Sequence, residues 1–498
     1  MLISIYLLLA SGLLEALFSL RSFWPLRHVL FIPLLAIISF SSALLVIERS
    51  GYWFVYLLAI SSIYRLFNLY RADTSPITKE HLRRVFQKSA ISLWLFQVCV
   101  ACLGLFFFYL PPRFNIYLAL LIIDAIVALV MLASTVRSMR VTTSIKLNTK
   151  LIDKDVPTLS VVIPARDESE SLYDCLHSLL ACDYPKLEVF VLDDHSSDRR
   201  TSEIVRSFAH DGVEFIPGKE LGGEWVAKNW AYEQLLEVSN GELVLFCGAD
   251  VRFEPESLRF LVSALTMRKK KMISVMPLSS PIIGFWKAAF REIRYGWELS
   301  LPRRKLGRPP VLSTCWVAKR DFLVDNGGFK GVSRKVSPES YFAKLALRDD
   351  SYSFFRYSSV VSKKQVKDQI ETAIRLRYPQ LHRRVEMVMI SASVEIMAAT
   401  IPIWLIIYGT VHGSLLLVIM SIVCYAMYSL SFSVLYRLTF DKYSILSYLL
   451  WPYVIIVDFI LLHLSMYKYE FGSVMWKGRS ISPPVMIHET QVTDSVPD

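Results

Sequence analysis

The segment LSVVIPARDE, residues 159–168, joins a short apolar run to three charged residues. An apolar run of this length that stops at a proline predicts a strand at 159–163, ending at Pro164. Residues 169–181 then carry leucines at helical spacing, and the apolar run 187–192 predicts a second strand. Short strands that alternate with amphipathic helices predict a parallel sheet covered by helices.

The same alternation continues to residue 247. We expect helices at 201–210 and 227–237, and strands at 214–216 and 243–247. The last strand leads directly into Gly248-Ala249-Asp250. The sequence therefore predicts a Rossmann-like α/β domain with a mostly parallel sheet.

Acidic residues follow three of the predicted strands: Asp167 and Glu168, Asp193 and Asp194, and Asp250. Ligands of open α/β sheets bind outside the carboxyl ends of the strands, so we expect these carboxylates to converge. Helix capping or turn formation is the alternative role for any one of them. A divalent cation that bridges two phosphates to a carboxylate would use such a cluster, and Asp250 is the candidate ligand.

Apolar runs long enough to cross a bilayer flank this domain. The chain has 498 residues, of which 53% are hydrophobic and 20% charged, a composition too apolar for a soluble enzyme of this length. A bilayer core takes roughly 20 residues per helix. We expect about eight spans, near 3–20, 28–47, 52–69, 90–110 and 115–135 before the domain, and near 387–408, 413–436 and 443–466 after it.

Basic residues predict the orientation, because Lys and Arg concentrate in cytoplasmic loops. Arg21 and Arg27 lie between the first two runs, and Arg71, Arg83 and Arg84 follow the third. Alternation from these loops places the α/β domain in the cytoplasm, at the plasma membrane. Three spans after it would leave the last basic residues outside, so one C-terminal run is miscounted or interfacial. The net charge of +11 is then explained by membrane topology, and no nucleic-acid partner is expected.

Three motifs together resemble glycosyltransferase family 2 in their order and spacing. They are Val161-Val162-Ile163-Pro164-Ala165-Arg166-Asp167-Glu168, Val191-Leu192-Asp193-Asp194-His195-Ser196-Ser197-Asp198 and Gly248-Ala249-Asp250. The resemblance covers about residues 159–384 and implies a GT-A fold that binds a UDP-sugar. Segments 225–231 and 476–479 resemble bacterial carotenoid glucosyltransferases, and 339–344 resembles ceramide glucosyltransferases, which implies a lipid acceptor in the membrane.

The resemblance also implies a role for individual residues. Asp250 would hold Mg²⁺ or Mn²⁺, and Glu339 would stand next to the position of the catalytic base. The donor would be held by Pro164, Ala165, Arg166 and Glu168 around the nucleotide, by Asp193 or Asp194 at the uracil, by Lys228 nearby, and by Arg377 and Tyr378 at the diphosphate.

Two positions depart from the family pattern. Gly248 replaces the first aspartate of the metal motif, and Ser340 replaces the usual base. A serine does not accept a proton near neutral pH unaided, so either Glu339 is the base or Asp349 or Asp350 reaches the site. The same departures leave open a catalytically degenerate domain that binds a nucleotide sugar or acts as a scaffold in a cell-envelope glycan pathway.

A processive polysaccharide synthase is a further alternative, but its usual Gln-x-x-Arg-Trp run corresponds here to Ile374-Arg375-Leu376-Arg377-Tyr378. Between 282 and 301, aromatic residues at helical spacing predict an interfacial helix beside the active-site mouth. The predicted organisation is an N-terminal helical bundle at 1–140, a GT-A domain at 141–385, a C-terminal bundle at 386–470 and a tail at 471–498. The sequence leaves the sugar, the lipid and the oligomeric state open.

Overall fold

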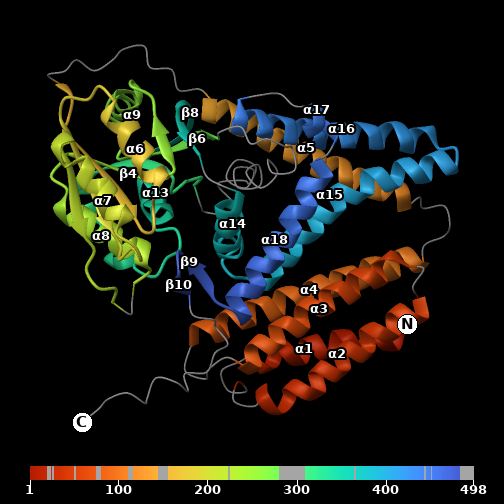
Figure 1. The fold of residues 1–498 in the computed structure, drawn as a ribbon. Coiled ribbons are helices and arrows are strands. Elements are labelled where there is room, and N and C mark those ends of the chain that lie inside the picture. Colours follow the sequence, from red (N-terminus) through yellow and green to blue (C-terminus); the bar gives the residue numbers. More distant parts are fainter. Residues whose placement is uncertain are drawn as a thin grey trace, which may run out of the picture.

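The computed structural model describes most of the chain as one α/β domain and a set of apolar helices (Figure 1). The domain lies on the left of the view and the helices on the right. The described residues are 1–19, 24, 27–49, 52–74, 80–109, 116–143, 155–222, 225–279, 309–363, 366–441, 445–449 and 451–482. The predicted interfacial helix at 282–301 falls outside them.

An eight-stranded sheet forms the centre of the domain, in the order β3-β2-β1-β4-β7-β6-β8-β5. The four predicted strands are confirmed as β1 to β4, and they are parallel to one another. The other half is mostly antiparallel, with β6 and β8 as its parallel pair, so the sheet is mixed. Four of its seven strand pairings are parallel, which confirms the predicted mostly parallel sheet. The strands are β1 (Leu159–Ala165), β2 (Leu187–Asp193), β3 (Val213–Pro217), β4 (Leu243–Cys247), β5 (Val251–Phe253), β6 (Met272–Ser279), β7 (Cys315–Lys319) and β8 (Tyr352–Ser362).

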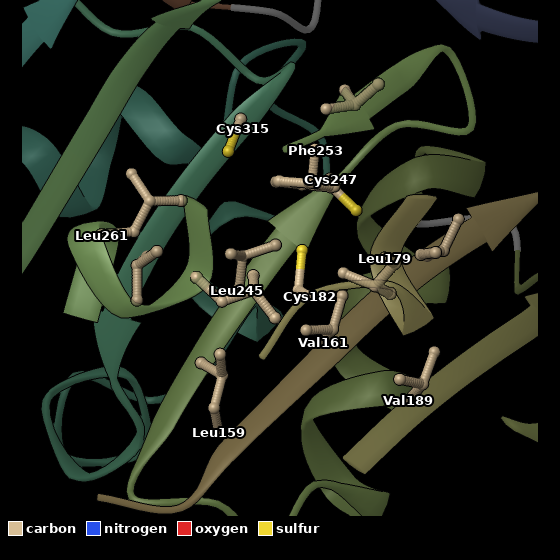
Figure 2. Packing of buried hydrophobic residues seen from close by; sticks show 14 of the residues in the cluster. Leu159, Val161, Leu179, Cys182, Val189, Leu245, Cys247, Phe253, Leu261 and Cys315 are labelled. Carbon is tan, nitrogen blue, oxygen red and sulfur yellow. The ribbon is translucent and has the colours of Figure 1, made fainter. Parts of the chain in front are cut away.

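Helices cover both faces of this sheet, because successive strand residues point to opposite sides. Val161 and Ile163 are buried in one core, part of which is shown in Figure 2, whereas Val162 is buried in the other. The helices are α6 (Glu170–Leu180), α7 (Arg200–Ser207), α8 (Ala227–Val238), α9 (Ser257–Thr266), α12 (Arg320–Asp325) and α13 (Glu339–Arg348). The predicted helices at 169–181, 201–210 and 227–237 are confirmed as α6, α7 and α8.

The order of the strands reverses at β1, because β2 and β3 lie on one side of it and β4 lies on the other. Open α/β sheets bind ligands outside the carboxyl ends of the strands at such a reversal of strand order. The loops after β1, β2 and β4 therefore meet at one edge of the sheet, and they carry the acidic residues singled out from the sequence.

Each of the eight apolar runs contains a described helix, and five of the described helices are long and apolar enough to cross a membrane. These five indicate a multi-pass membrane protein; they lie in α2 (Arg27–Arg49), α4 (Glu80–Tyr109), α5 (Ile116–Thr143), α15 (Val385–Val411) and α16 (Leu415–Phe440). The expected spans near 3–20, 52–69 and 443–466 are α1 (Leu2–Phe18), α3 (Trp53–Thr74) and the pair α17 (Ile445–Leu449) and α18 (Trp451–Phe471), which are shorter or more polar.

Ion pairs satisfy several charged side chains inside the helical part. The Arg65 guanidinium lies 3.0 Å from the Glu15 carboxylate and also donates to Gln97. Asp124 accepts a hydrogen bond from the Tyr428 hydroxyl at 2.9 Å. A carboxylate in a lipid environment is costly unless it is paired, so these contacts fix the helices relative to one another.

The sheet domain is attached directly to the ends of the apolar helices. Leu435 and Leu438 of α16 are buried in the same core as Val162 of β1. Just beyond α16, Asp441 forms a 2.8 Å ion pair with Arg356 of β8. The helix α14 (Val366–Gln380), which follows β8, packs against α18. The domain is therefore held at a fixed place beside the helices.

We expect Phe246→Ala to destabilise the sheet domain strongly. Phe246 is fully buried in β4, and its ring stacks on Trp316 with the centroids 4.0 Å apart. Removal of a buried phenylalanine ring costs about 3–5 kcal/mol. The Tm of the purified protein in detergent should fall by at least about 5 °C. The exposed Val324→Ala is the control, and equal Tm values for the two variants would contradict this packing.

Candidate functional site

The loops after β1 and β2 are held together by a set of short hydrogen bonds. Asp167 accepts from the Ser197 backbone N–H at 2.6 Å and from its hydroxyl at 2.8 Å. Asp167 and His195 both have positive φ, 49° and 55°. Non-glycine residues adopt such values at a cost, and these strained positions concentrate at functional sites. The loops after β1 and β2 therefore have a defined conformation, which side-chain hydrogen bonds hold in place.

Asp193 takes part in the turn after β2. Its Oδ1 accepts hydrogen bonds from the Ser196 backbone N–H at 3.2 Å and from the Ser196 hydroxyl at 2.5 Å. That hydroxyl in turn accepts from the Asp167 backbone N–H at 2.9 Å. Such hydrogen bonds from an aspartate to the residue three positions later stabilise a turn. The predicted role of Asp193 at the uracil remains a prediction.

Several charges of opposite sign surround the carboxylate of Asp194, which is only 3% exposed. Its Oδ1 lies 3.2 Å from the Arg479 guanidinium and 3.8 Å from the His195 ring, whereas its Oδ2 has no partner among the described residues. Burial raises the pKa of Asp194 more than the charges of Arg479, Arg166 and His195 lower it. The protonation state of Asp194 therefore depends on the positively charged side chains at this edge of the sheet.

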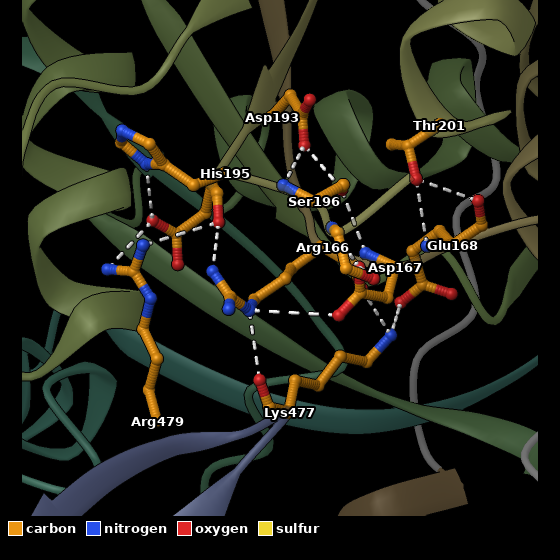
Figure 3. A network of polar contacts seen from close by, with 11 residues as sticks. Arg166, Asp167, Glu168, Asp193, His195, Ser196, Thr201, Lys477 and Arg479 are labelled. Carbon is orange, nitrogen blue, oxygen red and sulfur yellow. Dashed lines mark hydrogen bonds and ion pairs between the residues drawn. The ribbon is translucent and has the colours of Figure 1, made fainter. Parts of the chain in front are cut away.

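A hairpin from the far end of the chain reaches the same strand ends (Figure 3). It consists of β9 (Val474–Trp476) and β10 (Arg479–Ser482), which follow α18. The Lys477 ammonium donates to the Arg166 carbonyl at 2.8 Å and to the Glu168 carboxylate, and Arg166 Nε donates back to the Lys477 carbonyl at 2.9 Å. Sequence reasoning noted the Lys477-Gly478-Arg479 segment only as a family likeness, because nothing local indicates where it docks.

Pro164 and Ala165 contribute mainly backbone to the site. They pair in parallel register with Leu192 and Asp193 of β2, and the Ala165 carbonyl accepts from the Asp194 backbone N–H at 2.8 Å. This pairing sets the two loops side by side. It follows that the predicted nucleotide-pocket residues of β1 and the acidic pair after β2 are brought together.

Asp250, after β4, turns its carboxylate back over Gly248. Its Oδ2 accepts a 2.7 Å hydrogen bond from the Ser362 hydroxyl at the end of β8. A Cβ atom at position 248 would lie 2.6 Å from Asp250 Oδ1. Any larger residue there would displace the Asp250 carboxylate, which explains physically why glycine accompanies this orientation.

Lys228 of α8 and Glu339 of α13 form an ion pair. The Lys228 ammonium lies 3.3 Å from Glu339 Oε2, and the Glu339 side chain is 4% exposed. Both Glu339 and Asp250 act on Tyr232, whose pKa is raised first by burial and then by the charges of Glu339, Cys247 and Asp250. The Lys228 ammonium also lies 5.1 Å from the centroid of the Tyr232 ring, so the structure brings Lys228 and Glu339 together beside this ring.

Asn229 positions the loop that leads into Glu339. Its buried side-chain amide donates hydrogen bonds of 2.8–2.9 Å to the backbone carbonyls of Val332, Ser333 and Lys335. Glu339 follows at the first turn of α13, where the helix dipole favours a carboxylate. Sequence reasoning missed this role, although an asparagine among the apolar positions of helix 227–237 was a usable signal.

Ser340, Asp349 and Asp350, which the sequence placed at or near the position of the catalytic base, have contacts other than Glu339. The Ser340 hydroxyl donates to the Ser337 carbonyl at 2.6 Å within its own turn. Asp349 pairs with Lys271 at 2.7 Å, and Asp350 is exposed. These aspartates follow the last residue of α13, about 15 Å from Glu339 along the helix axis. The expectation that one of them reaches the site as a base is wrong for this arrangement.

Arg377 and Tyr378 contact the C-terminal helices. Arg377 Nε donates to Asp458 of α18 at 2.7 Å, and a second guanidinium nitrogen also contacts that carboxylate. The Tyr378 hydroxyl donates to Glu470 at 2.7 Å, and the ring is fully buried. The structure places both side chains in the interface between α14 and α18, so their predicted role at a diphosphate remains a prediction.

The residues present fit a divalent cation only in part. Among the described residues, no group of three or more His, Cys, Asp or Glu side chains is arranged to hold a metal. Asp250 offers one carboxylate, and Mg²⁺ is often held by one or two carboxylates together with substrate phosphates. The arrangement therefore suits a cation that arrives with a phosphorylated ligand.

Residues 160–324 match the family model "Glycosyl transferase family 2". Over 99 residues the chain is 36% identical to glycosyltransferase AglE of Haloferax volcanii, covering 19% of this chain and 31% of that protein. Over 134 residues it is 28% identical to 4,4'-diaponeurosporenoate glycosyltransferase of Staphylococcus aureus, covering 26% and 35%. The chain thus spans about a third of the length of these relatives.

A solved structure that is similar in outline is mannosyltransferase PcManGT from Pyrobaculum calidifontis in complex with GDP-Man and Mn²⁺. The sequence identity is 16%, and the similarity covers 71% of this chain and 97% of that chain with a TM-score of 0.41.

We expect Asn229→Ala to loosen the loop before α13. Three backbone carbonyls lose their common donor, so the amides around residues 328–341 should exchange faster in hydrogen–deuterium exchange mass spectrometry. Asn326→Ala, which removes one hydrogen bond at the end of α12, is the matched control. Unchanged exchange in these peptides would contradict the positioning role of Asn229.

Proposed function

The chain belongs to glycosyltransferase family 2 through residues 160–324, and on that premise we propose that it transfers a sugar from a UDP-sugar to a hydroxyl group of a membrane lipid. The observation that carries this proposal is the buried ion pair of Lys228 and Glu339, in a domain where acidic residues follow the adjacent parallel strands β1, β2 and β4. The loops after these strands lie at one edge of the sheet, where a nucleotide is expected to bind.

Donor binding uses two neighbouring parts of the sheet edge. The nucleoside would lie against the loops that contain Arg166, Glu168 and Asp194, and UDP is the nucleotide that the family likeness implies. The diphosphate would lie between these loops and Asp250. Mg²⁺ or Mn²⁺ bound there would neutralise charge that develops on the departing diphosphate.

Glu339 is the group in this site best placed to accept a proton. The Glu339 carboxylate is buried and is held by Lys228, which fixes its orientation. As the acceptor oxygen forms a bond to the anomeric carbon, the bond from that carbon to the phosphate oxygen breaks, and its electron pair leaves with UDP. The hydroxyl proton passes to Glu339. One displacement of this kind inverts the anomeric configuration.

The membrane helices support a lipid acceptor. Five long apolar helices belong to the same chain, and α16 is packed against the sheet core, so the site is held beside the expected bilayer. One relative is named for 4,4'-diaponeurosporenoate as its acceptor. The distribution of basic residues supports a cytoplasmic site at the plasma membrane.

We expect Asp250→Ala to lower sugar transfer by at least about 100-fold, because charge on the leaving diphosphate loses its carboxylate-held counter-charge. The measurement is sugar transfer from UDP-sugars to a membrane lipid extract by purified protein, with products detected by mass spectrometry. Asp325→Ala, at the exposed end of α12, is the control. UDP binding by the wild-type protein without turnover on any extract would instead favour a binding or scaffold role.

We expect Glu339→Gln to reduce kcat by about 10²–10⁴-fold while the KM for the donor changes little. Glutamine keeps the size and the hydrogen bonding of the side chain but does not accept a proton. Lys228→Met tests the orientation of Glu339 and should reduce kcat less. A Glu339→Gln enzyme with wild-type kcat would remove Glu339 from the mechanism.

A further inference from the structure

The hairpin formed by β9 and β10 presents two cations to the strand ends. Its two-residue loop, Lys477 and Gly478, has φ values of 45° and 77°. Positive φ at both loop positions is typical of a type I′ hairpin, where Asn and Gly are preferred. A lysine at such a position costs conformational energy, and residues of this kind concentrate at functional sites.

Both cations are bound to acidic residues of the candidate donor site. Lys477 contacts the Glu168 carboxylate, and Arg479 lies 3.2 Å from the Asp194 carboxylate. The two basic side chains are only 28% and 16% exposed, so their charges are screened less than those of surface residues. Two positive charges are thus concentrated where a nucleotide is expected.

The hairpin is fixed in this place by its base. Val474 is 2% exposed and packs in the core that contains Tyr378 and Tyr469. The backbone of the loop is also engaged, because Arg166 Nε donates to the Lys477 carbonyl. Packing at one end and hydrogen bonding at the other hold the two cations at the strand ends.

Arg377, the residue aligned with the family's diphosphate ligand, already has a carboxylate partner. Its guanidinium contacts Asp458 through two nitrogens and is 2% exposed. Separating a buried ion pair leaves an uncompensated buried charge, which disfavours the release of Arg377 to a donor. The negative charge of the diphosphate needs cations from elsewhere, and the hairpin follows the same helix, α18, that holds Arg377.

We infer that Lys477 and Arg479 bind the diphosphate of the nucleotide-sugar donor, an assignment that rests on the proposed function. The diphosphate then replaces Glu168 and Asp194 as partner of these cations, wholly or in part. Charge-assisted hydrogen bonds to phosphate are stronger than neutral ones, so each residue contributes measurably to donor affinity. The two residues supply positive charge in a domain whose metal motif has Gly248 in place of one aspartate.

The test compares UDP with uridine, because only UDP carries the phosphates. Binding of each is measured by isothermal titration calorimetry on the full-length protein in lipid nanodiscs with Mn²⁺. We expect Lys477→Met and Arg479→Met each to weaken UDP binding about tenfold or more and to leave uridine binding within about twofold. Lys271→Met, which removes an exposed cation paired with Asp349, should change neither.

A double variant separates direct contact from charge balance. Both proteins in this comparison carry Glu168→Gln, so that the effect of the Glu168 charge on UDP binding is the same in each. If Lys477 binds phosphate, then adding Lys477→Met to Glu168→Gln still weakens UDP binding. Equal UDP affinity of Glu168→Gln and the double variant would mean that Lys477 only neutralises Glu168, and would overturn the assignment for Lys477.

Other outcomes are equally distinct. Tighter UDP binding in Lys477→Met would show that the hairpin obstructs the site, and equal loss for UDP and uridine would show a structural role; either overturns the inference. UDP binding that is unchanged in both single variants overturns the inference alone. A wild-type protein that binds no UDP overturns the proposed donor as well.

Discussion

Buried charge at the ends of β1 and β2 is the constraint on which the arrangement of this site depends. Asp194 is 3% exposed, and a carboxylate removed from water costs several kcal/mol unless it is paired. Arg479, 285 residues later in the chain, supplies part of that pairing. For Arg479 to pair with Asp194, the chain that leaves α18 has to return to the sheet. This contact connects the α/β domain to the apolar helices.

Buried charges are also paired in the interface between α14 and α18. Arg377 and Asp458 neutralise each other in a buried interface, and Tyr378 donates to Glu470 nearby. Such pairs fix the register between helices more than they add net stability. Because α14 packs on α18 and on β9, and the hairpin follows α18, one helix orients both α14 and the hairpin.

Local patterns were sufficient to predict half of the sheet. The strands β1 to β4 and the helices α6, α7 and α8 follow from periodicity within short segments, and the acidic loops follow from the parallel order of the strands. The antiparallel half lacked such a local signal. Short-range patterns also do not predict the ion pair of Lys477 with Glu168 or that of Arg377 with Asp458, because these pairs depend on how distant segments of the chain pack.

The glycine at position 248, where the family has an aspartate, is related to the position of the Asp250 carboxylate. Gly248 leaves room for the Asp250 carboxylate to fold back toward the chain, where the Ser362 hydroxyl holds it. A cation bound by one protein carboxylate is neutralised less by the protein than one bound by two, so it retains more attraction for phosphate. It is also held less firmly before the donor arrives. Fixed cations from the hairpin would offset that weakness, since a side chain anchored by a packed hairpin needs no prior metal binding to be in place.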